Sequence, residues 1–149
     1  MSDKKRVYVM SRSTVHHNFS HPKASHVIIS ITDFQEPFTP YIDTQRTDCL
    51  GVLAMRFGDF ESQADTQMPV FDEEKADLLA SFIKVHWNSI SFLGINCDAG
   101  LSRSAGVAEA LITFFGLDAV EIFSYQQFKM PNSLVKNLLV KALQKHFAP

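Results

Sequence analysis

One stretch in the second half of the chain carries residues that could do phosphate chemistry. In FLGINCDAGLSRSAG, residues 92–106, five residues separate a cysteine, Cys97, from an arginine, Arg103. An apolar run precedes the cysteine and a helical pattern follows the arginine. A short loop between a strand and a helix can turn successive backbone N–H groups inward on one anion. We therefore expect a phosphate or another oxyanion to bind to Asp98, Ala99, Gly100, Leu101, Ser102 and Arg103.

The cysteine in this loop has the surroundings of a nucleophile. Backbone N–H groups, a helix N-terminus and the Arg103 guanidinium all favour the thiolate form of Cys97. The planar guanidinium also matches two phosphate oxygens and can tighten on the transition state. Ser102 and Ser104 place hydroxyls beside the sulfur, and one of them can hydrogen-bond to it. The loop is thus suited to forming and breaking a phosphocysteine.

Transfer of a phosphoryl group to Cys97 also requires a proton for the leaving oxygen. A carboxylic acid on a loop after a strand can supply it and then act as a base on water. The polar segment 58–70 follows a strand-like run and contains three such groups, Asp59, Glu61 and Asp65.

Apolar runs and helical patterns alternate along the chain. Four runs predict strands, over 6–10, 26–31, 49–57 and 91–96. Helical patterns cover 71–88, 103–115 and 118–129, and Asn132 can cap a last helix. Gly116 is a stop signal for the second of these helices. The order predicts a single α/β domain over 1–149, with a central, mostly parallel sheet of about four to five strands flanked by helices.

Composition limits the possible partners. The chain has 149 residues, of which 46% are hydrophobic and 20% charged, and its net charge is −2 with neutral histidines. This balance gives no basic surface for a nucleic acid and no affinity for an anionic membrane. No apolar run is long enough to span a bilayer. We expect a cytoplasmic protein without a cofactor.

Other reactive or aromatic residues have simpler interpretations. His16, His17 and His21 fit no common metal-ligand spacing, and we expect no metal site. Cys49 is expected to be a buried small residue in its strand, with a redox partnership with Cys97 as the lesser alternative. The aromatics of the 33–41 segment are expected to fill the core rather than to line a pocket for an aryl group; they are Phe34, Phe38 and Tyr41.

The loop resembles the signature of a known enzyme family. Cys97-Asp-Ala-Gly-Leu-Ser-Arg-Ser104 is similar to the Cys-x-x-Gly-x-Ser-Arg-Ser loop of the compact, dual-specificity-like branch of the cysteine-dependent protein tyrosine phosphatases. The resemblance implies a phosphatase-like α/β fold, with Cys97 as nucleophile and Arg103 as phosphate ligand. It assigns Ser104 to phosphocysteine breakdown and Asp59, in the segment MRFGDFES, to the general acid. The implied substrate is a protein phosphotyrosine, with phosphoserine and phosphothreonine as further candidates.

The chain departs from the family at the residue before the nucleophile. The family usually has histidine there, in the hydrogen-bond network that holds the loop, whereas this chain has Asn96. The side-chain amide of Asn96 can make some of those hydrogen bonds, but it lacks the imidazole ring of histidine. We expect a less strongly activated thiolate and a slower enzyme.

Two other functions remain open at this point. The loop could capture phosphorylated partners without rapid turnover, as a binding module. Within the enzymes, phosphoinositides and RNA 5′-phosphates are alternatives because the family also hosts them. The loop lacks the additional Lys or Arg that such highly charged ligands favour.

Overall fold

A computed structural model of the chain describes residues 5–11, 24–32, 48–60, 70–97, 102–122 and 131–149. Its strands form one sheet in the order β3-β2-β4-β1-β5, and every neighbouring pair is parallel. The strands are β1 (Arg6–Ser11), β2 (His26–Thr32), β3 (Cys49–Arg56), β4 (Phe92–Cys97) and β5 (Asp118–Ile122). The helices are α2 (Glu73–His86), α3 (Arg103–Phe115) and α4 (Ser133–His146), and a 3₁₀ turn, Trp87–Ser89, follows α2.

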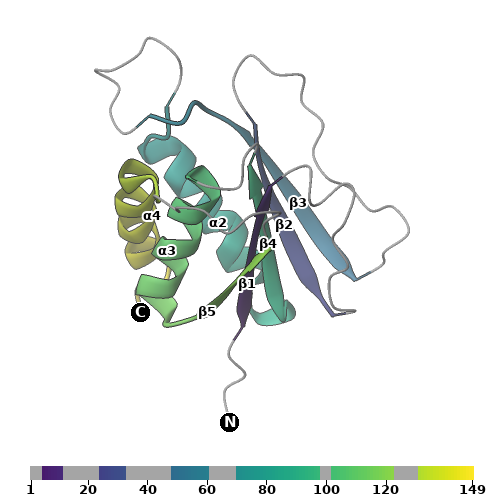
Figure 1. Ribbon diagram of the computed structural model, residues 1–149. Helices are drawn as coiled ribbons and strands as arrows, with labels where there is room; N and C mark the ends of the chain where they lie inside the picture. The colour runs from purple at the N-terminus through teal and green to yellow at the C-terminus, as the bar shows by residue number, and fades with distance from the viewer. Residues whose placement is uncertain (1–4, 12–23, 33–47, 61–69, 98–101, 123–130) are drawn as a thin grey trace.

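The three helices lie together on one side of the sheet (Figure 1). Alternate side chains of β1, β2 and β4 point to that side and join the helices in one hydrophobic core. Helix α4 packs against both α2 and α3. The predicted α/β class and the mainly parallel sheet are confirmed, and the architecture is consistent with a tyrosine-phosphatase-like fold. The fully buried members of the core include Val7, Val27, Ile29, Leu93, Ile95, Leu79, Ile83, Leu111 and Leu139.

Local signals in the sequence set the helix ends. Asp72 Oδ1 accepts a hydrogen bond from the Lys75 N–H at 2.8 Å, and Asn132 Oδ1 accepts one from the Val135 N–H at 3.1 Å. These are N-caps that satisfy donors left open in a first helical turn. At the end of α3, Gly116 has φ = 70° and its N–H bonds to the Ile112 carbonyl at 2.8 Å. A left-handed residue at this position favours glycine.

The sequence prediction of a helix over 118–129 is wrong for its first part. Asp118–Ile122 forms β5, which pairs with β1 from Arg6↔Asp118 to Met10↔Ile122. Without β5, β1 would be an edge strand with a row of unpaired backbone groups. Pairing with that row outweighs the weak local helical pattern of five residues. Residues 123–130 lie outside the described part of the chain.

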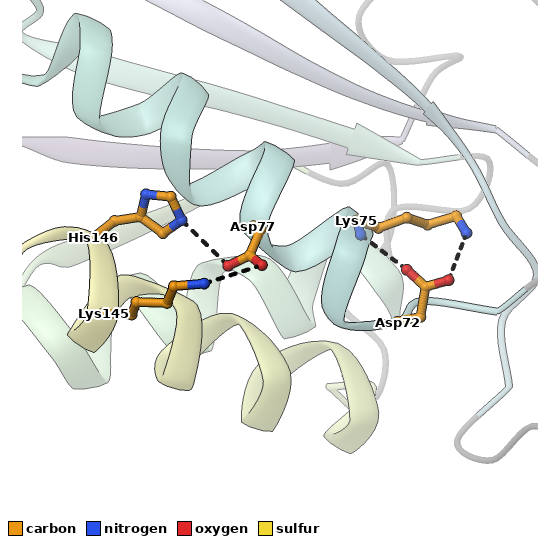
Figure 2. Close-up of polar contacts among 5 residues, drawn as sticks. All are labelled: Asp72, Lys75, Asp77, Lys145 and His146. Atoms are coloured by element: carbon orange, nitrogen blue, oxygen red, sulfur yellow. Dashed lines mark hydrogen bonds and ion pairs between the residues drawn. The ribbon is translucent and has the colours of Figure 1, made fainter.

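Polar contacts join α2 and α4, where Asp77 faces Lys145 and His146 (Figure 2). Asp77 of α2 is 3.5 Å from Lys145 Nζ and 3.2 Å from His146 Nε2, both on α4. The Lys145 and Asp77 side chains are 71% and 42% exposed. An ion pair so exposed contributes about 0.2–1 kcal/mol at most. Apolar packing therefore carries most of the contact between these helices.

Helix α3 lies against the start of α4 at Gly106. A Cβ atom there would lie 2.8 Å from the Asn132 carbonyl oxygen and 3.0 Å from Val135 Cβ. The first distance is far below an ordinary van der Waals contact, and the obstacle is backbone rather than a flexible side chain. The absence of a side chain at residue 106 thus fixes where α4 begins.

We expect Gly106→Ala to destabilise the fold. Alanine forms helices better by about 1 kcal/mol, but the overpacking at the α4 backbone costs more, so the expected net loss is about 1–2 kcal/mol. The midpoint of urea unfolding measures it. Thr113→Ala, at an exposed position of the same helix, is the control and should shift stability by less than about 0.5 kcal/mol. An unchanged midpoint for Gly106→Ala would show that α4 is free to move.

Candidate active site

The parallel sheet brings the carboxyl ends of its strands to one edge. Ser30 of β2 is level with Asn96 of β4, and Thr32 of β2 is level with Arg56 of β3. Cys97, which ends β4, and the segment that follows β3 therefore lie at the same edge. In open α/β sheets this edge is where ligands bind.

Cys97 is buried beneath the start of α3. Cys97 is 1% exposed, and it lies on the helix-facing side of β4 together with Leu93 and Ile95. The Sγ atom lies 3.1 Å from the Oγ atom of Ser104, which is fully buried in the first turn of α3. Of the two serines considered from the sequence, it is Ser104 that contacts the sulfur.

Ser102 occupies the N-cap position of α3, but its side chain makes no capping bond. Its carbonyl accepts the Gly106 N–H at 2.8 Å, while its hydroxyl turns away to a carboxylate. No acidic residue lies in the first turn of α3. The positive end of the helix dipole is therefore not neutralised by a side chain of the helix itself, which favours an anion at this end.

Arg103 spans the distance between α3 and β3. The residue is only 5% exposed, and its Nη1 atom donates a hydrogen bond to the Phe57 carbonyl at 2.8 Å. Phe57 directly follows β3 and is itself fully buried. Burying a guanidinium is costly, and a bound anion lowers that cost. The backbone carbonyl that follows β3 therefore fixes the orientation of the Arg103 side chain.

Asp59 joins the same cluster. Its Oδ1 atom accepts a hydrogen bond from Ser102 Oγ at 2.8 Å and another from Asn132 Nδ2 at 2.9 Å. Asp59 remains exposed in spite of these bonds. The structure thus brings together five of the residues selected from the sequence, namely Asp59, Cys97, Ser102, Arg103 and Ser104, and the Ser102 hydroxyl bonds to Asp59.

Asn96 lies on the opposite face of the sheet from Cys97, as expected for neighbours in a strand. It is fully buried, and its Oδ1 atom accepts a hydrogen bond from Ser30 Oγ at 2.9 Å. Its Nδ2 atom has no hydrogen-bond partner among the described residues. The side chain of Asn96 therefore pairs with β2.

Cys49 is separate from this cluster. It begins β3, whereas Cys97 ends β4, so in a parallel sheet the two cysteines lie at opposite edges. Both are thiols, and the Cys49 Sγ atom lies 3.6 Å from the Gly51 carbonyl oxygen. The alternative of a redox partnership between Cys49 and Cys97 is therefore wrong.

Several sequence predictions concern residues outside the described part of the chain. They are the loop residues Asp98, Ala99, Gly100 and Leu101, the alternative acids Glu61 and Asp65, the histidines His16, His17 and His21, and the aromatics Phe34, Phe38 and Tyr41. Among the described residues, no three histidine, cysteine or carboxylate side chains are grouped as metal ligands.

Two residues near the strand ends, Asn132 and Ser30, make contacts that the sequence did not indicate. Asn132 was predicted only as a helix cap, and Ser30 only as a strand residue. Their partners, Asp59 and Asn96, are 73 and 66 positions away. No local pattern links residues so distant, so only the positions of the strands and of α4 could have revealed these contacts.

A cavity of about 180 Å³ lies elsewhere, between α2 and α4. Asp77 and Lys145 lie in its wall and already pair with each other. It shares no lining residue with the cluster at the strand ends. The chemistry suggested by the sequence therefore does not extend to this cavity.

Comparison of the chain with protein-family models, curated proteins and solved structures finds no match. Within the described residues, every helix is too short or too polar to cross a membrane. The site must therefore be interpreted from its own geometry.

We expect Ser30→Ala to destabilise the fold by about 1–3 kcal/mol, because it leaves the buried side-chain oxygen of Asn96, Oδ1, without its hydrogen-bond donor. Urea unfolding followed by tryptophan fluorescence measures the change. Ser91→Ala, at an exposed position just before β4, is the control and should have little effect. Equal midpoints for the two variants would mean that the Ser30–Asn96 bond contributes no net stability.

Proposed function

We propose that this protein is a cysteine-dependent phosphatase that hydrolyses phosphate monoesters, with protein phosphotyrosine as the favoured substrate and phosphoserine or phosphothreonine as further ones. The observation that carries the proposal is the hydrogen bond between Asp59 and Ser102, which are 43 residues apart. It joins the candidate acid to the loop that holds the candidate nucleophile. A phosphate ester bound at this loop would contact both the candidate acid, Asp59, and the candidate nucleophile, Cys97.

In the first step, the Cys97 thiolate attacks phosphorus, and a sulfur–phosphorus bond forms as the ester oxygen–phosphorus bond breaks. Asp59 gives its proton to the departing oxygen. Arg103 and the N-terminus of α3 stabilise the charge on the phosphoryl oxygens. The hydrogen bond from Arg103 to the Phe57 carbonyl holds the guanidinium ready for that role.

In the second step, water attacks the phosphocysteine, and the Asp59 carboxylate takes a proton from the water. The sulfur–phosphorus bond breaks and the thiolate returns. The Ser104 hydroxyl, 3.1 Å from the sulfur, supports this step because it can donate a hydrogen bond to the departing thiolate. Neither step needs a metal or another cofactor.

A cytoplasmic location belongs to the same proposal. A catalytic thiolate requires a reducing compartment, and both cysteines of the chain are thiols. The implied partner is a phosphorylated protein or peptide.

The direct test is a phosphopeptide panel with the wild type, Cys97→Ser and Asp59→Asn. We expect phosphotyrosine hydrolysis by the wild type, none by Cys97→Ser, and a kcat lower by roughly 100-fold or more in Asp59→Asn. Released phosphate is the readout. Full activity of Asp59→Asn would remove Asp59 from the mechanism. Phosphopeptide binding by the wild type without turnover at any pH would identify a binding module instead.

The role of Arg103 has its own test. Arg103→Lys keeps the charge but loses the planar fork, so we expect kcat to fall by about 100-fold or more and phosphate to inhibit more weakly. Arg56→Lys, at an exposed position at the end of β3, is the matched control and should behave as the wild type. Equal kinetics for Arg103→Lys and the wild type would contradict bidentate binding by Arg103.

A further inference from the structure

The side chain of Asn132 is bonded at both ends. It is only 1% exposed, and its Oδ1 atom accepts the Val135 N–H as the cap of α4. Its Nδ2 atom donates to Asp59 Oδ1 at 2.9 Å and to the Phe60 carbonyl at 3.1 Å. The residue that starts α4 therefore also holds the segment that follows β3.

The backbone of Asn132 is fixed as firmly as its side chain. Its N–H donates to the Ser102 carbonyl at 3.0 Å, and its carbonyl oxygen lies 2.8 Å from the position that a Cβ atom on Gly106 would take. Asn132 cannot shift toward or away from α3 without losing these contacts. The side-chain amide of Asn132 is therefore held in one position relative to Asp59.

Both donors to Asp59 meet the same oxygen. Ser102 Oγ and Asn132 Nδ2 lie 2.8 and 2.9 Å from Oδ1. A protonated carboxyl group has one oxygen that only accepts hydrogen bonds and one that carries the proton. Two donors on Oδ1 make it the accepting oxygen, so the proton belongs on Oδ2.

We propose that Asn132, together with Ser102, is a positioning residue that fixes Asp59 Oδ1 and selects Oδ2 as the oxygen that protonates the leaving group. This inference rests on the proposed function and deepens it. The same two donors keep the carboxylate oriented when it acts on water in the second step. The alternative is that Asn132 is only a helix cap.

The variant Asn132→Asp separates the two roles. Aspartate caps a helix as well as asparagine does, so α4 keeps its first-turn bond. The Nδ2 donor is replaced by an oxygen that cannot donate and that faces Asp59 and the Phe60 carbonyl. Asn137→Asp makes the same exchange at an exposed position of α4 and serves as the control.

The readout is kcat on aryl phosphates whose leaving groups range from strongly activated to poor. A good leaving group needs little proton transfer, so a mispositioned acid affects it least. We expect Asn132→Asp to lose less than about threefold on the most activated ester and roughly 10- to 100-fold on phenyl phosphate, with KM changed little. Asn137→Asp should match the wild type throughout. In an Asp59→Asn background, Asn132→Asp should cause no further loss on phenyl phosphate.

Ser102→Ala provides a second test if Asn132→Asp does not fold. The Ser102 side chain caps nothing, so removing its hydroxyl leaves α3 intact. It should give the same dependence on the leaving group as Asn132→Asp. An equal loss on every ester, or no loss, would overturn the positioning role while leaving the phosphatase assignment standing. A wild type that hydrolyses none of the esters would overturn the phosphatase assignment and the positioning role with it.

Discussion

The contact between α3 and α4 at Gly106 is the constraint on which the candidate site depends. Because residue 106 has no side chain, the Asn132 backbone can lie against α3 and donate its N–H to the Ser102 carbonyl. That bond sets the position of the Asn132 amide, and the amide sets that of Asp59. The close packing of the two helices at Gly106 thus affects the position of the Asp59 carboxylate at the edge of the sheet.

The features that the sequence predicted well are those encoded within a few residues. The end of α3 follows from Gly116, and Asn132 caps α4 as its residue type indicates. The pairing of a cysteine with an arginine in one short loop likewise needs no knowledge of the fold. Each of these signals acts over a single turn of chain, so tertiary packing has little power to overrule it.

The features that the sequence did not predict are those set by distant partners. Strand β5 forms because it pairs with the free edge of β1, and no local pattern within Asp118–Ile122 predicts a strand. The bonds from Ser30 to Asn96 and from Asn132 to Asp59 depend on strand order and on where α4 begins. Asn96 shows the limit most clearly. Its residue type indicated a change in the loop, whereas the one described hydrogen bond of its side chain goes to Ser30 in the neighbouring strand.

The strand order also governs how this chain can fold as it is made. Strand β2 pairs with β3 and β4, whereas β1 pairs with β4 and β5. Until Phe92–Cys97 has emerged, β1 has no partner, and the β2–β3 pair is not joined to it. Parallel pairing over such long sequence separations makes folding slow, because loop closure is paid for before the contacts form. Strand β4, which joins β1 to the β2–β3 pair, is also the strand that ends in Cys97, so these two parts of the sheet cannot be joined before the candidate nucleophile has been synthesised.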